Sequence, residues 1–337
     1  MTNPLHPNDR QSAISAILEI FRAHRHFLVT SHSRPDGDAI GSSLAAMYLL
    51  QAMGKEVVVA LADPVPRTFA SLPGADRIVQ TQPAMSAEVA LILECDSVAR
   101  TGFDHLAAPL SINIDHHRSG TDFATVNWIE PTAVAVGAML YELAVAADIQ
   151  VSPEIATCLY AALLTDTVRF TIPSLKAETF ELAHQLVRLG ADAAGVAEAV
   201  YHSVRPARLR VLGTALLRLQ VHGDVAWSAV TLGEIEAAQA EVEDCEDIVN
   251  YVIGIQGVCA GAFLRELSAN RFRVSLRSKG PVDVAAIAET LGGGGHQNAS
   301  GCTLEGPLPT LAERLTELLQ SACSGNGAWP SPKGPHD

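Results

Sequence analysis

The fold is decided by residues 27–54, which read FLVTSHSRPDGDAIGSSLAAMYLLQAMG. The apolar run Phe27–Ser31 is typical of a buried strand. After a polar turn, Ala39–Met53 has a helical pattern, and Gly54 stands where a helix commonly ends. Further strands are predicted at Val57–Leu61, Val89–Leu93 and Ser111–Ile114. Continuous apolar strands that alternate with helices predict an α/β fold, a parallel sheet with helices on both faces.

Polar clusters stand at the ends of apolar runs. They are His32-Ser33-Arg34-Pro35-Asp36-Gly37-Asp38, Glu94-Cys95-Asp96, Asp115-His116-His117, and Asp166 after the run Cys158–Leu164. We expect each cluster where a hydrophobic strand stops. In open α/β sheets, ligands bind at the carboxyl ends of the strands, so the clusters are expected to converge on one site.

The chemistry of these clusters points to metal. Histidine, aspartate and glutamate together suit hard or borderline divalent ions such as manganese, and the clusters offer enough ligands for two ions. Two metals about 3.5–4 Å apart can generate a hydroxide and hold the oxygens of an in-line phosphoryl displacement. The clusters therefore predict a two-metal phosphoesterase.

Length and composition favour a globular protein of two domains. The chain has 337 residues, of which 48% are hydrophobic and 18% are charged, and this length exceeds that of most single cores. The formal net charge of −14 argues against a general nucleic-acid coat, which needs a broad basic surface. We therefore expect a short nucleotide substrate and no long duplex.

The N-terminal segment and the cysteines favour a cytoplasmic protein. Met1–Arg10 lacks the apolar segment of a signal peptide, and no apolar run is long enough to predict a membrane span. The six cysteines are dispersed without a CxxC pair. Some could pair, but we expect free thiols in a reducing compartment.

Two domains, a connector and a tail are predicted along the chain. Residues 12–190 are expected to form the metal-binding catalytic domain and 223–322 a smaller α/β substrate-binding domain, with the active site in the cleft between them. Residues 191–222 are expected to be a helical connector and 323–337 a disordered tail. Further helices are predicted at Gln11–Ala23, Pro153–Leu164, Leu175–Leu189, Asp244–Ile253 and Val282–Leu291, and further strands at Val225–Thr231, Cys259–Leu267 and Arg271–Arg277.

The first and fourth clusters each allow an ordinary structural role. Asp36 or Asp38 alone is explained as a helix cap, but a cap does not explain the adjoining His32. Asp166 alone is explained equally well as a turn residue.

In the third cluster, consecutive histidines at a strand end are rarely both core residues. We expect one of His116 and His117 to bind metal and the other to contact a phosphate, with Asp115 fixing the imidazole of the metal-binding histidine. The second cluster is ambiguous, because the strand before it delivers either Glu94 or Asp96 and the spacing does not choose.

A glycine-rich segment in the second domain, residues 292–301, reads GGGGHQNASG. Glycines let a backbone approach an anion closely, and successive N–H groups can bind phosphate. No Gly-Lys-Ser/Thr follows, so the segment is not a P-loop. A flexible linker is the alternative, which His296 directly after the run disfavours. Arg277, at a strand end upstream, would add positive charge, with a solvated strand end as the competing explanation.

Taken together, these motifs resemble those of the DHH phosphoesterases, in the branch that includes bacterial nano-RNases and pAp phosphatases. The resemblance spans about residues 12–322. The first cluster, continued through Gly41-Ser42, resembles the family's first motif, and Asp115-His116-His117 resembles the motif that names the family. Thr165-Asp166-Thr167 looks like the fourth motif, although Val168 stands where relatives often have glycine. Gly292–Gly301 resembles the signature of the DHH-associated C-terminal domain.

The resemblance implies specific roles for these residues. It implies metal ligands at His32, Asp36, Asp38, His116 and Asp166, and contact with the scissile phosphate at His117. Glu94 stands six residues before Arg100, where the family normally has a bridging aspartate, so it would bridge the metals, with Asp96 as the substitute. Arg277, Gly293, Gly294, Gly295 and His296 would bind the substrate.

The implied activity is manganese-dependent hydrolysis of short single-stranded oligoribonucleotides to mononucleotides and of 3′-phosphoadenosine 5′-phosphate to AMP. No membrane partner is expected, and a homodimer is common among relatives. One alternative is a phosphodiesterase for linear or cyclic dinucleotides, such as pApA and c-di-AMP. The other is a nucleotide-binding regulator whose catalysis is impaired by the change to Glu94.

Overall fold

The computed structural model describes residues 10–82, 87–117, 120–172 and 175–325. It divides the chain into two compact units, Met1–Ser203 and Val204–Asp337, here called unit 1 and unit 2. The predicted connector, 191–222, is shared between them, because Val196 packs in the core of unit 1 and Val211 in a core of unit 2. The other predicted domain boundaries stay predictions.

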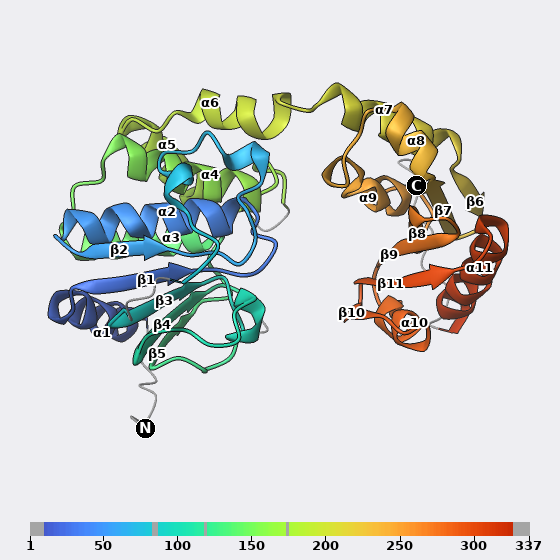
Figure 1. The fold of residues 1–337 in the computed structure, drawn as a ribbon. Coiled ribbons are helices and arrows are strands. Elements are labelled where there is room, and N and C mark those ends of the chain that lie inside the picture. The colour runs from blue at the N-terminus through green and yellow to red at the C-terminus, as the bar shows by residue number, and fades with distance from the viewer. Residues whose placement is uncertain (1–9, 83–86, 118–119, 173–174, 326–337) are drawn as a thin grey trace, which may run out of the picture. The chain divides into compact units, whose positions relative to one another are not determined.

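Unit 1 contains a parallel sheet of five strands in the order β2-β1-β3-β4-β5 (Figure 1). The strands are β1 (His26–Thr30), β2 (Glu56–Val59), β3 (Val89–Leu93), β4 (Leu110–Asp115) and β5 (Val126–Ile129). The α/β class is confirmed, and the four strands predicted here are found within two residues of their expected ends. The fifth, β5, escaped the sequence analysis.

The two faces of this sheet are covered differently. Side chains alternate across a strand, so Phe27 and Val29 of β1 face a core built with α-helices, whereas Leu28 faces a smaller cluster with Phe103 and Leu106. Among the described residues, those that pack on that second face, such as Phe103, Leu106 and Phe123, belong to loop segments. The short 3-10 helix η3 (Ala99–Thr101) precedes the first two of them in the chain. The helices of unit 1 are α1 (Arg10–Ala23), α2 (Gly37–Ala52), α3 (Val136–Ala146), α4 (Pro153–Asp166), α5 (Ala177–Arg188) and α6 (Ala193–Ala197), followed by the π-helix η4 (Glu198–His202).

Unit 2 is built on a six-stranded sheet in the order β10-β11-β9-β8-β7-β6. Its strands are antiparallel to their neighbours except for the parallel pair β7–β8. The strands are β6 (Gln220–His222), β7 (Val225–Val230), β8 (Ala260–Ser268), β9 (Arg271–Ser278), β10 (Gly294–His296) and β11 (Ala299–Glu305). The helices are α7 (Pro206–Leu217), α8 (Leu232–Ala237), α9 (Ile248–Ile253), α10 (Val284–Thr290) and α11 (Leu308–Gly325). The predicted smaller α/β unit is thus confirmed.

The cysteines differ from expectation. Cys259 and Cys323 form a disulfide, with a Cα–Cα distance of 6.7 Å. The pairing joins the residue before β8 to the last part of α11, and a sequence separation of 64 residues hid it from the sequence analysis. The other four cysteines are free and buried.

The C-terminal end also differs from the prediction. Residues 323–325 continue α11 instead of beginning a tail, and residues 326–337 of the predicted tail lie outside the described residues. Over the part of the chain that the structure describes, no helix is both long and apolar enough to cross a membrane.

Candidate metal centre

The predicted metal-binding residues come from strand ends and helix ends of unit 1. His32 follows β1, Glu94 follows β3, and Asp115 ends β4 with His116 and His117 directly after it. Asp36 is the N-cap of α2 and Asp38 lies in the first turn of that helix. Asp166 is the last residue of α4. Its cluster therefore stands at a helix C-terminus and not at a strand end as expected.

His116 lies at the centre of the site. Its Nδ1 is 3.1 Å from the carbonyl oxygen of Ala133. A carbonyl only accepts, so Nδ1 carries the proton and Nε2 is left with a lone pair. That Nε2 lies 3.7 Å from Oε2 of Glu94 and 3.5 Å from Oδ2 of Asp166. In metal sites, a hydrogen bond from the ring nitrogen that does not bind the metal, here Nδ1, orients the histidine.

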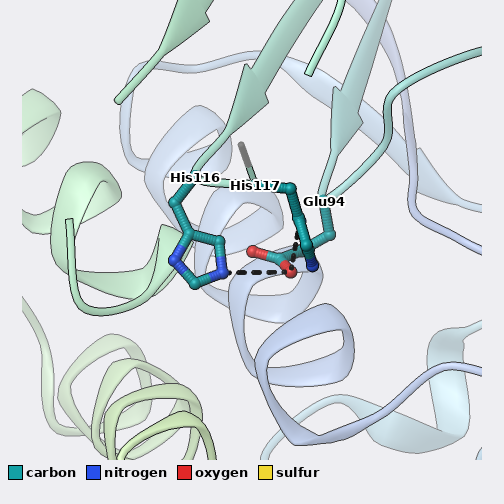
Figure 2. A group of neighbouring side chains, drawn as sticks. All are labelled: Glu94, His116 and His117. Atoms are coloured by element: carbon teal, nitrogen blue, oxygen red, sulfur yellow. Dashed lines mark ion pairs between the residues drawn. The ribbon is translucent and has the colours of Figure 1, made fainter. Parts of the chain in front are cut away.

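Two overlapping groups of possible ligands share His116. One is Glu94, His116 and His117, whose side chains point toward one another in Figure 2, and the other is Asp38, His116 and Asp166. Within each group the potential ligand atoms lie within 4.8 Å of one another. Segments far apart in sequence are thus brought together as the clusters predicted.

Glu94, and not Asp96, reaches this centre. The Glu94 side chain is 2% exposed, and its Oε1 is buried with no hydrogen-bond partner among the described residues. Its backbone has a φ of 62°, a left-handed conformation that is uncommon outside glycine and is found at functional sites. Asp96 instead accepts a hydrogen bond from Ser97 Oγ at 3.0 Å and pairs with the guanidinium of Arg100 at 3.8 Å.

Asp38 has a second function that the sequence analysis missed. Its carboxylate accepts hydrogen bonds from the backbone N–H groups of Val136 at 2.6 Å and Gly137 at 3.1 Å, and from Ser42 Oγ at 2.6 Å. The first two donors are N–H groups in the first turn of α3 that have no partner within the helix. The N-cap of α3, Ala135, offers no capping side chain. Asp38 therefore caps the start of α3 from a distant part of the chain.

Glycines in α2 allow α2 and α4 to pack closely beside the site. A Cβ at Gly37 would overlap the side chain of Thr165, next to Asp166. A Cβ at Gly41 would overlap the backbone of Cys158 and Ala162. Close approach of the two helices brings Asp38 and Asp166 to the same place.

His32 and Asp36 form a pair beside the two groups. His32 Nε2 is 3.7 Å from Asp36 Oδ1, while Asp36 also caps α2 by accepting from the N–H of Ala39 at 3.0 Å. The capping role and the predicted clustering with His32 therefore hold together. Burial alone would raise the pKa of Asp36, but the hydrogen bonds from His32 and Ala39 lower it below its usual value.

Asp115 fixes the orientation of His117, whereas the sequence predicted that it would fix the metal-binding histidine. The central His116 is held by the carbonyl oxygen of Ala133 instead. Its Oδ1 lies 2.7 Å from His117 Nδ1 and accepts from the His117 backbone N–H at 3.1 Å. The hydrogen bond to Asp115 raises the pKa of His117 against the effect of burial. Burial would raise the pKa of Asp115, and the bonds to His117 lower it. The arrangement leaves His117 Nε2 free to contact a substrate oxygen.

The carboxylates of the centre repel one another. Burial, followed by the charge of Asp38, raises the pKa of Glu94 well above its usual value. The same two causes raise the pKa of Asp166 to about 7. A divalent cation would remove both penalties, because it screens the charges and gives the unpaired Glu94 oxygen a partner. The residues therefore fit a metal ion.

The glycine-rich segment of unit 2 is a short hairpin. Gly294–His296 forms β10 and pairs with β11 through Gly301, Ser300 and Ala299. Gly295 has a φ of 147°, and a Cβ there would overlap the backbone of Ala299 and Ser300, so glycine is required for this pairing. Gly293 likewise lies against the backbone of Gly301. The segment is thus folded, and the linker alternative is excluded.

The other predicted substrate-binding residues lie on the same sheet. Arg277, in β9, is paired with Ala299 of β11, and its Nη1 donates to the carbonyl of Leu276 at 3.0 Å. The side chain of His296 lies outside what the structure describes. The metal-binding residues predicted from the sequence are all in unit 1, and the predicted substrate-binding residues are all in unit 2.

A cluster of carboxylates and histidines at the carboxyl edge of a parallel sheet is typical of hydrolases that use metal to act on phosphate esters. The sequence matches the DHH family N-terminal domain over residues 26–163 and the DHHA1 domain over residues 225–324. The chain belongs to the DHH family of phosphoesterases, and it is a hydrolase of that kind.

Named relatives agree with this assignment. The chain is 32% identical to the bifunctional oligoribonuclease and PAP phosphatase NrnA of Thermus thermophilus, over 89% of this chain and 90% of that protein. It is 26% identical to the cyclic-di-AMP phosphodiesterase GdpP of Geobacillus thermodenitrificans, over 96% of this chain and 52% of that protein. Among solved structures, an exopolyphosphatase-related protein of Bacteroides fragilis is similar, with a TM-score of 0.83, 28% identity, and coverage of 94% of this chain and 98% of that one.

Proposed function

We propose that this protein is a manganese-dependent, two-metal phosphoesterase. Its substrates are short oligoribonucleotides, which it degrades to mononucleotides, and 3′-phosphoadenosine 5′-phosphate, which it converts to AMP. It acts in the cytoplasm as a homodimer. The observation that carries the proposal is the pair of overlapping ligand groups that share His116.

The ligand groups support two ions for a geometric reason. Asp38, His116 and Asp166 form one set, and Glu94 approaches His116 from the other. His32, shortly after β1, and Asp36, the N-cap of α2, lie 3.7 Å apart and would supply the further ligands that a second ion needs beyond Glu94. Oxygen and imidazole ligands of this kind suit manganese.

The roles of the side chains follow from their contacts. The bound ions would supply an activated water and neutralise charge on the phosphate. Ala133 orients His116, and the backbone N–H of Val136 at the start of α3 orients the Asp38 carboxylate. Asp115 holds His117 so that Nε2 can donate to a phosphate oxygen, where charge develops during displacement.

Substrate binding is assigned to unit 2. Arg277, Gly293, Gly294, Gly295 and His296 would hold a phosphate or another part of the nucleotide. The folded glycine hairpin supports this proposal, because its backbone N–H groups can approach an anion without side chains in the way. The named activity of the Thermus thermophilus relative supports the choice of short RNA and 3′-phosphoadenosine 5′-phosphate.

A substrate panel tests the proposal. Purified protein with manganese is assayed on pApA, a five-nucleotide RNA, 3′-phosphoadenosine 5′-phosphate and pyrophosphate. We expect turnover of the first three and little of pyrophosphate. Metal-free protein should be inactive and recover with manganese. Absence of turnover together with tight nucleotide binding would instead support a regulator that has lost catalysis.

A second candidate is a phosphodiesterase for linear or cyclic dinucleotides. Similarity to GdpP over nearly all of this chain favours it, although the chain spans only 52% of that relative. Adding c-di-AMP to the panel separates the two. Cleavage of pApA or c-di-AMP at a rate that far exceeds the rates for pentanucleotide RNA and 3′-phosphoadenosine 5′-phosphate would favour the second candidate.

A further inference from the structure

We propose that Phe170, Phe180 and Val168 form a stacking platform for a nucleobase, beside the metal centre. The three residues are called here the aromatic platform. The inference rests on the proposed function and extends it, because it assigns a binding site for the base of a nucleotide within unit 1. None of the metal-binding residues supplies such a surface.

The platform is a pair of stacked rings, of which Phe170 is partly buried against the core and Phe180 is exposed. The rings of Phe170 and Phe180 have centroids 5.4 Å apart and planes inclined by 28°. Phe180, on the first turns of α5, is 53% exposed, and so is Val168. Phe170 is anchored from behind by Tyr160 of α4, with ring centroids 6.5 Å apart. A fixed ring with an open neighbour offers the flat apolar face on which bases stack.

The segment that carries the platform has an unusual backbone. Val168, Arg169 and Phe170 have φ angles of 46°, 63° and 60°. A single left-handed residue is ordinary after a helix, but three in succession without glycine are costly, most of all for the β-branched Val168. Such strain persists where the surrounding structure imposes it, which is common at binding sites.

Buried Thr167 imposes this conformation. Its Oγ1 donates to the carbonyl of Leu163 at 2.7 Å and accepts from the N–H of Phe170 at 3.1 Å. Its carbonyl accepts from the N–H of Thr171 at 3.0 Å. The segment is thereby fixed to the end of α4 with Phe170 turned toward Phe180.

The platform follows a candidate metal ligand closely along the chain. Val168 and Phe170 follow Asp166 by two and four residues, so the chain holds them within about 14 Å of it. Arg169, between them, is exposed, with its guanidinium 4.7 Å from the ring centroid of Tyr201. An apolar surface beside a cation and a metal centre is complementary to a nucleotide, which joins a flat base to an anionic phosphate.

Binding measurements test the platform independently of catalysis. In the presence of manganese, 5′-AMP and ribose 5-phosphate are titrated against the protein by calorimetry, since the two differ only in the base. Stacking on an aromatic side chain contributes about 1–3 kcal/mol per base, so Phe180→Ala should weaken AMP binding about 5- to 150-fold. It should leave ribose 5-phosphate unchanged, and Phe180→Trp should restore AMP binding.

Val187→Ala is the matched control. Val187 is 49% exposed on the same helix, α5, but is aliphatic and stands outside the platform. It should change neither affinity by more than about twofold, as expected for an exposed substitution. The ratio of the wild-type turnover to the turnover of Phe180→Ala is then measured with pApA and with the two analogues that each lack one adenine. One analogue should lose its dependence on Phe180.

The outcomes are distinct. If Phe180→Ala weakens AMP and ribose 5-phosphate equally, the residue is structural and the platform is wrong. If it leaves both affinities unchanged and alters the mass measured by light scattering, the surface is an interface between copies and the platform is wrong. If the wild type turns over pApA but Phe180→Ala has the same effect on the affinity for AMP and for ribose 5-phosphate, only the platform is overturned. If Phe180→Ala weakens the binding of AMP and not of ribose 5-phosphate, but the wild type turns over no substrate, the proposed function is overturned and the platform is supported.

Discussion

The candidate residues of unit 1 and unit 2 are held in opposite ways. In unit 1, Glu94 Oε1 and Asp115 Oδ2 are buried without a hydrogen-bond partner among the described residues. In unit 2, the side chains around the glycine hairpin are satisfied: Ser278 Oγ donates to Val282 at 2.6 Å and Asn298 Nδ2 donates to Gly280 at 3.1 Å. Buried polarity without partners is costly unless something binds there. The contrast marks unit 1 as the place for a cation and unit 2 as a preformed backbone surface.

The largest effect is expected at His116. His116→Ala removes the residue that both ligand groups share. Loss of a residue that only orients a ligand costs about 10–100-fold, so loss of the ligand itself should lower activity by more than about 100-fold. The measurement is turnover of pApA, together with manganese affinity by calorimetry.

His184→Ala provides the control, because His184 lies on α5 outside both groups. Circular dichroism should show both variants folded. Near-normal turnover by a folded His116→Ala protein would contradict the assignment of the metal centre to unit 1.

A smaller but more diagnostic effect is expected at Glu94. Glu94→Gln keeps the shape of the side chain and removes its buried charge, so activity should fall at least about tenfold. The metal-free protein should become more stable, because the carboxylate is buried near Asp38 and Asp166. Asp96→Asn, the matched control, should have little effect on activity. The reverse ranking of the two variants would transfer the bridging role to Asp96.

In unit 2, His296→Ala should impair cleavage of nucleotides without affecting the metal centre. Manganese affinity is expected to match that of the wild type, because both ligand groups that contain His116 lie in unit 1. Part of the effect should appear as a higher KM. The loss of binding energy from a remote part of the substrate can also lower kcat. A small artificial phosphodiester should be nearly indifferent to the change. If manganese binding disappears in His296→Ala, the proposed division between the units is wrong.

The smallest effect on activity is expected from the disulfide. Cys323→Ser should lower the free energy of unfolding of unit 2 by about 2–4 kcal/mol, the usual contribution of such a bond. Turnover at moderate temperature should stay within about twofold. Calorimetry with and without a thiol reductant checks the stability, since the reduced wild type should match the variant, and a turnover assay under the same two conditions checks the activity. If the reductant changes nothing and thiol titration finds six free cysteines, the pair does not form in solution.

Much of the fold was predictable because local patterns determined it. The strand β3, Val89–Leu93, is apolar at every position and was predicted with its observed ends. The helix α3 was missed, because its N-cap is Ala135, which gives no start signal. Its cap is Asp38, about a hundred residues earlier in the sequence, and such a long-range contact has no local pattern.

The candidate site was predictable in its residue types and less so in its geometry. The histidine and carboxylate clusters were recognised, and the structure brings Asp38, Glu94, His116, His117 and Asp166 together. The choice between Glu94 and Asp96 depended on the left-handed backbone of Glu94, which no pattern of side chains encodes. Ala133 and Ser42, which orient His116 and Asp38, act through a carbonyl and a hydroxyl that the sequence does not distinguish from others.

The order of these residues along the chain has a consequence for synthesis on the ribosome. Asp166 is the last of the candidate ligands, and the core of unit 1 is completed by residues up to Tyr201. Domains generally fold as units, the N-terminal one first. A nascent chain would therefore possess its whole set of metal ligands before the glycine hairpin of unit 2 had been translated. Unit 1 can therefore bind its ions before the synthesis of unit 2 is complete, and this binding would stabilise the nascent chain.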